Sequence, residues 1–275
     1  MSHFYTSFDF SVHHDTALYS VYLQRNIVLD IVLPSHYHSS QEFYKVLYMN
    51  DGQDLERLHL LDVLKKSHHS SMLSPFIVIA VHCGERIMEY GVASQADYKE
   101  RGAKAGDYTS FVLHELMPYI ESKYRVLKGP EHTVFCGFSL GGLSAFDITW
   151  HHPSHFGKAG VFSGSFWWRQ RAFDEYYDDY HDRIMHRLVR ESPWFPPHSK
   201  PRFWLQTGTE DETDDRNNNG VIDSIDDTLD LIAELEKKGY RLGEEVCYVE
   251  VQGGQHNQET WAAIMPEFLR WAFGS

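Results

Sequence analysis

Short runs of apolar residues recur along the chain at a length and spacing that suit buried strands. Between residues 20 and 33, apolar and β-branched residues predict two strands, with a turn around Arg25-Asn26 and an end at Pro34. Further runs follow at residues 44–49, 76–81, 133–136, 160–162, 203–206 and 246–251. Continuous apolar runs of this length are typical of strands that are buried on both faces, as in parallel sheets.

Helical patterns separate these strands. Residues 108–124 place their large apolar side chains near one stripe, and residues 226–238 begin with acidic residues and end before Gly239. Residues 262–273 predict a last helix. The alternation predicts a single α/β domain over residues 1–275, a mostly parallel central sheet with helices on both faces. The aromatic and charged stretch 166–201 predicts an insertion over the carboxyl edge of the sheet, where ligands bind in such folds.

Composition excludes some classes of function. The chain has 275 residues and a net charge of −14, without the clusters of Lys and Arg that a nucleic-acid-binding protein needs. No apolar run approaches the roughly 20 residues that span a bilayer. The first residues do not have the pattern of a secretion signal, so we expect a cytoplasmic protein that binds neither nucleic acid nor membrane. The oligomeric state stays open.

One glycine-rich segment carries a candidate nucleophile. Gly137-Phe138-Ser139-Leu140-Gly141-Gly142 lies between the predicted strand 133–136 and a helical pattern at 143–150. A G-x-S-x-G sequence between a strand and a helix is the nucleophile elbow of α/β-hydrolases, in which Ser139 stands at the apex of a sharp turn. The alternative is a tight strand–helix turn with a serine that has no chemical role.

A serine nucleophile needs a base, and the base in turn needs an acid. Among 18 histidines, His256 is distinct because it follows the last predicted strand and precedes a helix. In α/β-hydrolases the order along the chain is serine, then Asp or Glu, then histidine. The acid should follow the strand 203–206, where Asp211 is the first choice and Glu210 the second. Spacing alone does not decide between them.

Several further segments resemble one family of α/β-hydrolases that includes esterase D and the enterochelin, feruloyl and acetylxylan esterases, together with the mycolyltransferases. The resemblance covers nearly the whole chain. Its motifs are Asp51-Gly52-Gln53, Arg86 with Glu89-Tyr90, Glu115 to Ile120 with Tyr124-Arg125, the nucleophile elbow, Ser163 to Trp168, Gly208-x-x-Asp211, and Gly254-x-His256 with Trp261.

The resemblance implies the roles of further residues. It favours Asp211 over Glu210 as the acid, and it implies an oxyanion hole made by the backbone N–H groups of Leu140 and Gln53. The alternative for Asp51-Gly52, if the resemblance is set aside, is an ordinary turn. Arg86 and Arg169 are expected at the surface, or else in contact with an anionic substrate.

These expectations predict a serine carboxylic ester hydrolase that needs no cofactor for catalysis. Its substrate is expected to be a small-molecule ester, with aryl, sugar and siderophore esters as candidates. Trp167 and Trp168 follow a predicted strand and suit an aromatic or sugar group, although core packing explains them equally well. The alternatives are an acyltransferase with the same triad and a non-catalytic relative that binds carbohydrates or siderophores.

A second motif predicts a structural calcium ion. Residues 215–226 follow the twelve-residue calcium-loop template, although the segment before them reads as a strand and not as a helix. The sharp turn at position 6 falls on Gly220. The alternative is a solvated acidic loop whose carboxylates cap the following helix. The expected ligands are Asp215, Asn217, Asn219, the backbone carbonyl of Val221, and Asp226.

Overall fold

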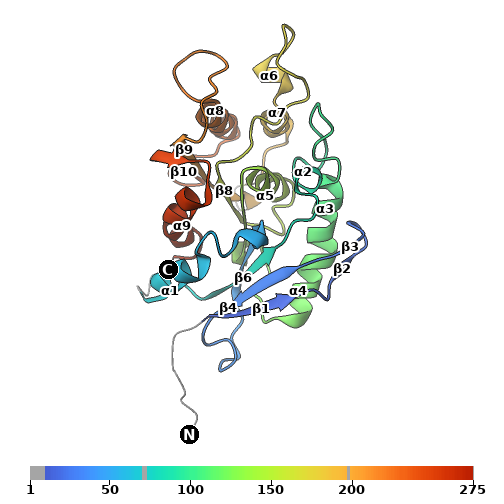
Figure 1. Cartoon of the computed structure of the whole chain (residues 1–275), viewed down its shortest axis with the longest axis vertical. Coiled ribbons are helices and arrows are strands. Elements are labelled where there is room, and N and C mark those ends of the chain that lie inside the picture. The colour runs from blue at the N-terminus through green and yellow to red at the C-terminus, as the bar shows by residue number, and fades with distance from the viewer. Residues whose placement is uncertain (1–9, 70–72, 197–198, 275) are drawn as a thin grey trace.

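A computed structural model describes residues 10–69, 73–196 and 199–274. In this part of the chain, eight strands form one sheet in the order β1-β4-β6-β5-β7-β8-β9-β10 (Figure 1). The strands β5 to β10 are parallel, whereas β1 and β4 run antiparallel to their neighbours. Their bounds are β1 (Ser11–Asp15), β4 (Leu29–Leu33), β5 (Lys45–Asn50), β6 (Phe76–Val81), β7 (Thr133–Phe138), β8 (Lys158–Phe162), β9 (Arg202–Glu210) and β10 (Val246–Gln255).

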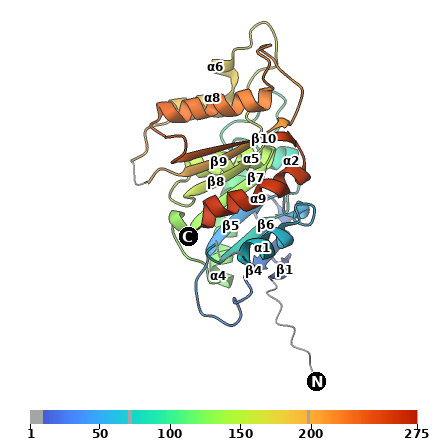
Figure 2. The ribbon, with the colours of Figure 1, turned by 90° about the vertical axis from the view of Figure 1, so that its left-hand side faces the viewer.

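Helices cover both faces of this sheet, as Figures 1 and 2 show. One face is covered by α1 (Leu60–His69) and α9 (Gln258–Phe273). The other carries α3 (Ala105–Phe111), α4 (Met117–Lys123), α5 (Leu140–His151), α7 (Ile184–Glu191) and α8 (Asp223–Lys237).

Alternate residues of a strand supply the two cores. In β5, Val46 and Tyr48 pack in the core of α5, while Leu47 and Met49 pack in the core of α1 and α9. Strands buried on both faces need apolar side chains at every position, which explains the continuous apolar runs. The predicted α/β sheet with helices on both faces is therefore confirmed.

The antiparallel edge differs from the sequence prediction. A small hairpin of β2 (Tyr19–Ser20) and β3 (Arg25–Asn26) precedes β4, so the turn spans residues 21–24 and the predicted turn at 25–26 is wrong. The turn is tight because Gln24 adopts a positive φ of 52°. The strand β1 was not predicted, because its residues are alternately exposed and lack a continuous apolar run.

The predicted helix 108–124 is interrupted in its middle. It comprises α3, a π-helical turn η2 (Val112–Leu116) and α4. Pro118 lies at the start of α4 and has no N–H to donate to the preceding turn. A π-helical turn before a proline accommodates this loss, so the apolar stripe continues while the hydrogen-bond pattern changes.

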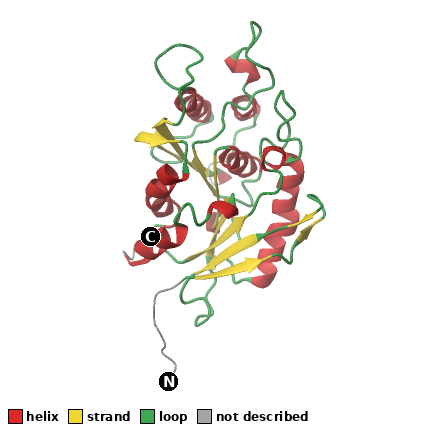
Figure 3. Ribbon diagram, in the orientation of Figure 1, coloured by secondary structure: helices red, strands yellow, loops and turns green. Residues whose placement is uncertain are grey.

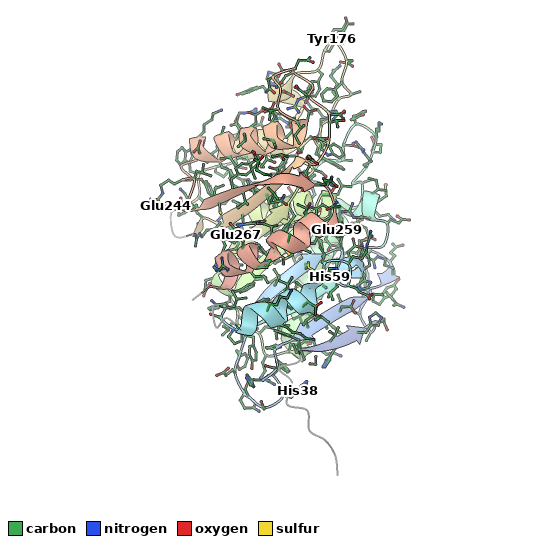
Figure 4. The ribbon with its side chains drawn as sticks, turned by 60° about the vertical axis from the view of Figure 1, so that its left-hand side comes forward. His38, His59, Tyr176, Glu244, Glu259 and Glu267 are labelled. Atoms are coloured by element: carbon green, nitrogen blue, oxygen red, sulfur yellow. The ribbon has the colours of Figure 1, made fainter. Side chains whose placement is uncertain are left out.

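The predicted insertion at 166–201 contains α6 (Asp179–Asp182) and α7 within long loops (Figure 3). The Arg183 guanidinium, at the junction of α6 and α7, lies 2.8 Å from the buried Asp227 carboxylate of α8. Figure 4 shows Tyr176 at the far tip of this segment, well beyond the sheet. The remaining short helices are α2 (Arg86–Glu89), η1 (Gly52–Asp54) and η3 (Pro130–His132).

Candidate active site

The predicted site residues follow the carboxyl ends of neighbouring strands. Phe138 at the end of β7 pairs with Phe162 of β8, so Ser139 and Ser163 leave the sheet side by side. Glu210 at the end of β9 pairs with Gln255 at the end of β10, so Asp211 and His256 are the next residues of adjacent strands. The register therefore brings the predicted nucleophile, acid and base to the same edge of the sheet.

Ser139 has the strained backbone of a nucleophile elbow. Its φ is 54° and its ψ is −120°, and α5 begins at the next residue, Leu140. A side chain on Gly137 would lie 2.2 Å from the Gly141 carbonyl oxygen, so only glycine fits where strand and helix approach. Leu140 is the first residue of α5, and its N–H has no acceptor within the helix.

A bidentate ion pair holds the second half of the predicted oxyanion hole. Asp51 has a φ of 60° and is 2% exposed. Its carboxylate accepts Arg86 Nε (2.8 Å) and Nη2 (2.9 Å), and Arg86 Nη2 also donates to the Phe138 carbonyl (3.0 Å). Arg86 thus joins the Asp51 turn to the residue before the nucleophile. It is therefore not a free surface residue, although its side chain stays 36% exposed.

Neutral hydrogen bonds add to this connection. The Asp51 N–H donates to the Tyr90 hydroxyl (3.0 Å), and Asn50 Nδ2 donates to the Gly141 carbonyl (2.8 Å). Gln53, which follows the turn in η1, anchors its side chain on Asp51 Oδ1 (2.9 Å). These contacts leave the backbone N–H groups of Gln53 and Leu140 on neighbouring, rigidly connected segments.

Asp211 is better placed than Glu210 to act as the acid. Asp211 Oδ2 accepts the Gly208 N–H (3.0 Å), while its Oδ1 is buried and accepts no hydrogen bond from the described part of the protein. Burial raises the pKa of Asp211, although the Gly208 N–H, the Ser163 hydroxyl and His256 act in the opposite direction. Glu210 is exposed and accepts Gln255 Nε2 at 3.3 Å.

The charges of Asp211 and Arg86 act on the pKa of His256 in opposite directions. His256 keeps an exposed edge, and its ring meets the buried Trp261 ring edge-on with centroids 5.3 Å apart. Partial desolvation lowers the pKa of His256, Asp211 raises it, and Arg86 lowers it, with a net lowering. A histidine that is neutral at physiological pH is suited to act as a general base.

The nucleophile and the base are not hydrogen-bonded to each other. Among the described residues, no hydrogen bond joins Ser139 to His256, and Ser139 Oγ lies instead 3.3 Å from Ser165 Oγ. Catalytic hydrogen bonds are often loose without substrate and tighten in the complex. Ser163 and Ser165 had not been singled out from the sequence as functional residues, because buried serines occur in many turns.

The two predicted aromatic substrate contacts lie in different environments. Trp168 is completely buried, donates Nε1–H to the Gln95 carbonyl (3.2 Å), and packs on the backbone of Gly91 and Gly102. Its position fits the core-packing alternative. Trp167 is partly exposed, with the Arg101 guanidinium 4.7 Å from its ring centroid.

The predicted calcium loop closes around a mixed set of side chains. Asp226 Oδ2 accepts the side-chain amides of Asn217 (2.9 Å) and Asn219 (2.7 Å), and Asp215 Oδ2 accepts the Gly220 N–H (2.9 Å). Gly220 makes the sharp turn with a φ of 87°. No group of three His, Cys, Asp or Glu side chains suited to a metal occurs in the described residues. The loop offers two carboxylates and two amides.

Position 9 of the template is Asp223, and its carboxylate is engaged by Arg216 of the same loop. The Asp223 carboxylate accepts the Arg216 backbone N–H (2.9 Å) and lies 3.2 Å from its guanidinium. The helix α8 begins at Asp223, three residues earlier than the sequence predicted. Val221 donates its N–H to Asn219 Oδ1 (2.7 Å), a bond that keeps the loop compact.

Comparison with known proteins agrees with this arrangement. The family described as "Putative esterase" matches residues 20–272, nearly the whole chain. The chain belongs to this family. It is a serine esterase by that membership, and the predicted resemblance is confirmed. None of the described helices combines the length and apolar character needed to cross a membrane.

Individual relatives are distant in sequence. The uncharacterized protein YbbA of Bacillus subtilis is 22% identical over 248 residues, covering 89% of this chain and 91% of that protein. The iron(III) enterobactin esterase of Escherichia coli K12 is 36% identical over 66 residues, only 24% of this chain and 16% of that protein.

Solved structures share the fold. A ferulic acid esterase superposes with a TM-score of 0.72 at 20% identity, covering 97% of this chain and 98% of that one. The enterochelin esterase of Shigella flexneri also gives 0.72, at 19% identity, and its match covers 96% of this chain but 58% of its own length.

Proposed function

We propose that this esterase hydrolyses carboxylic esters through a triad of Ser139, His256 and Asp211. The proposal is supported by the shared strand edge: Ser139, at a strained elbow, follows the carboxyl end of β7 in the same sheet in which Asp211 and His256 follow the adjacent ends of β9 and β10. His256 takes the Ser139 proton as the hydroxyl attacks the ester carbonyl, and Asp211 stabilises the imidazolium that forms. The imidazolium gives its proton to the departing alcohol, which leaves an acyl-enzyme, and water, deprotonated by His256, then releases the acid and restores the Ser139 hydroxyl.

The oxyanion of each tetrahedral intermediate would be held by the N–H groups of Leu140 and Gln53. Donors that are fixed before the reaction stabilise developing charge without reorganisation, and one such donor is worth about 10²–10³ in turnover. The Arg86–Asp51 pair and the Asn50–Gly141 bond support this role, because they fix the two donor segments relative to each other.

The test is hydrolysis of p-nitrophenyl acetate by the wild type and by Ser139→Ala. Removal of a triad serine lowers turnover about 10⁶-fold in the subtilisin example, so the variant should fall to the background rate. Equal rates in the two proteins would reject Ser139 as the nucleophile. Adding sugar or alcohol acceptors separates hydrolysis from acyl transfer, because a transferase would release an acylated acceptor.

The substrate class that we propose is an ester with an aryl or sugar group, siderophore esters included. Trp167 supports this class. Its ring is partly exposed, and it follows Ser165 by two residues in the sequence, while the Ser165 hydroxyl lies 3.3 Å from the Ser139 hydroxyl. Aromatic faces bind phenolic and sugar rings. The structural neighbours named ferulic acid esterase and enterochelin esterase agree with this class. A panel of aryl, sugar and siderophore esters would rank the candidates.

We further propose that the loop 215–226 binds a structural calcium ion. Asp215, Asn217, Asn219 and Asp226 converge by their mutual hydrogen bonds, which is the donor set that a weak calcium loop offers. Two carboxylates, one of them an aspartate at the last position, suggest modest affinity. The ion would order the loop that follows Asp211, and no catalytic step involves it.

A further inference from the structure

The side chain of Gln53 is exposed, and yet its amide is held on both sides. Its Oε1 accepts the backbone N–H of Cys83 at 3.2 Å, while its Nε2 donates to Asp51 Oδ1 at 2.9 Å and to Cys83 Sγ at 3.2 Å. A backbone N–H can only donate, so the amide oxygen has to face Cys83 and the orientation of the amide is fixed. An exposed glutamine is ordinarily free in solvent, because ordering its side chain costs conformational entropy. Three hydrogen bonds on one exposed amide therefore need an explanation.

The amide fastens the turn of Gly52 to the segment that ends β6, an interior strand of the sheet. A side chain on Gly52 would lie 2.7 Å from the Ala80 carbonyl oxygen and 2.8 Å from the His82 ring, so only glycine fits here. The His82 ring is itself held, because its Nε2 lies 2.7 Å from Asp30 Oδ2 on the neighbouring strand β4. The turn is thus seated on a rigid strand end, and the Gln53 side chain joins it to the next residue of that segment.

The Cys83 thiol takes part as a neutral hydrogen-bond partner. It is partly buried, and burial together with the nearby Asp51 carboxylate raises the pKa of this thiol to about 12. The sulfur is therefore protonated at physiological pH, and the thiol form is a poor nucleophile. What Cys83 offers to Gln53 is a lone pair for the amide nitrogen and a backbone N–H for the amide oxygen.

We propose that the Gln53 side chain and Cys83 together position the backbone N–H of Gln53 as the second donor of the oxyanion hole. That N–H donates to no other group among the described residues, as a donor that serves the substrate requires. The backbone of Gln53 contacts the oxyanion, while its side chain holds this backbone in place, and Cys83 is a positioning residue that acts through it. The inference rests on the proposed function, because the hole has a purpose only if Ser139 forms a tetrahedral intermediate.

The variant Gln53→Ala keeps the backbone donor and removes its anchor. With p-nitrophenyl acetate, kcat and kcat/KM should fall together, about 10- to 100-fold, because a misplacement of about 1 Å costs up to about 100-fold and an interaction made only in the transition state lowers both equally. The melting temperature should stay nearly constant, because the side chain is exposed. Gln170→Ala is the matched control, since it removes another exposed amide that donates to two groups, the His181 carbonyl (3.3 Å) and the Asp182 carboxylate (3.1 Å). It should leave kcat unchanged.

Two variants of Cys83 measure the share of the thiol. Cys83→Ala removes the sulfur and keeps the backbone N–H, so kcat should fall about two- to fivefold, as expected for the loss of a weak acceptor. In a Gln53→Ala background the same change should cause no further loss, because the amide that it contacts is gone. Cys83→Ser restores an acceptor and should return kcat close to the wild-type value. Cys247→Ala removes another partly buried thiol, in β10, and should not change kcat.

Three results would overturn the inference while Ser139→Ala is inactive. The first is an unchanged kcat in Gln53→Ala, and the second is a rise in KM at constant kcat, which would assign the amide to substrate binding. The third is a loss from Cys83→Ala that is equally large with and without the Gln53 amide. Failure of the proposed function is distinct from all three, because it would leave Ser139→Ala as active as the wild type.

Discussion

The two halves of the candidate site are held by different interactions. On the oxyanion side, a buried carboxylate, Asp51, is fully paired with the Arg86 guanidinium. On the acid side, Asp211 accepts one backbone N–H, and its other, buried oxygen accepts no hydrogen bond from the described residues. The first half needs only a rigid backbone. The second needs a carboxylate whose charge remains available to an imidazolium, and a permanent cation beside it would weaken that interaction.

The strongest test of this contrast compares the two carboxylates after β9. Asp211→Asn should lower kcat about 10⁴-fold, as it does for the acid of the serine-protease triad, because the amide no longer stabilises the imidazolium. Glu210→Gln should change kcat by less than about threefold, since the one side-chain hydrogen bond of Glu210 among the described residues is with the exposed Gln255 amide. Initial rates with an aryl ester measure both. The reverse ranking would assign the acid to Glu210.

On the other side, Arg86→Met should lower both stability and activity. The variant leaves the buried Asp51 carboxylate without its cation. The free energy of unfolding should fall by about 3 kcal/mol, the lower end of the range for breaking a buried ion pair, because Arg86 is partly exposed. Turnover should fall about 10- to 100-fold as the Gln53 donor shifts, less than the full loss of an oxyanion-hole donor. Thermal melting and kcat measure the two effects.

The matched control is Arg25→Met, because Arg25 pairs with the buried Glu89 carboxylate in the same bidentate geometry, at 2.9 and 2.8 Å. It should lower the melting temperature by a similar amount while kcat changes little. If both variants lose the same fraction of activity, the Arg86 pair stabilises the fold without a specific role in the oxyanion hole.

The sequence alone predicted those parts of the candidate site whose residues lie close together along the chain. The elbow was predictable, because a strand, a serine between glycines and a helix follow each other within 20 residues, from Thr133 to His151. The Arg86–Asp51 pair spans 35 residues, and an arginine after a strand is ordinarily solvated. The hydrogen bond between Trp261 and Ser163 spans 98 residues, so no local pattern indicates it either.

The fold shows the same limit. The apolar runs located the parallel strands, but β9 and β10 extend to Glu210 and Gln255, beyond the apolar residues. These extensions depend on pairing between the two strands, with an irregularity between Val251 and Gln255 that no local pattern indicates. They matter for the proposed triad, because they make Asp211 and His256 the next residues of adjacent strands.

The pH dependence of the reaction also distinguishes the Arg86 side of the site from the Asp211 side, and the expected effect is smaller. A histidine acts as a base only when it is neutral, and the pKa of His256 is lowered from its ordinary value. We therefore expect kcat/KM to rise with pH, with a midpoint below about 6.5, and to be constant around neutral pH. Arg86→Met removes a cation that lowers this pKa, so the midpoint should move to higher pH. Asp211→Asn removes the carboxylate that raises it, so the midpoint should move lower. Midpoints that are equal in all three proteins would exclude His256 as the titrating base.

Calcium should have the smallest effect on catalysis, because none of its proposed ligands belongs to either half of the site. Excess calcium should raise the melting temperature and chelator should lower it, by several degrees if the ion is present at about 100 times its Kd. Turnover at low temperature should be unchanged.

Asn219→Ala is the variant that tests the loop, since the Asn219 side chain hydrogen-bonds both the Asp226 carboxylate and the Val221 N–H. It should abolish the calcium response, whereas Asn26→Ala, in the hairpin at the other end of the sheet, should keep it. If the melting curves of the wild type are the same in calcium and in chelator, the loop binds no structural calcium ion and is held by its own hydrogen bonds alone.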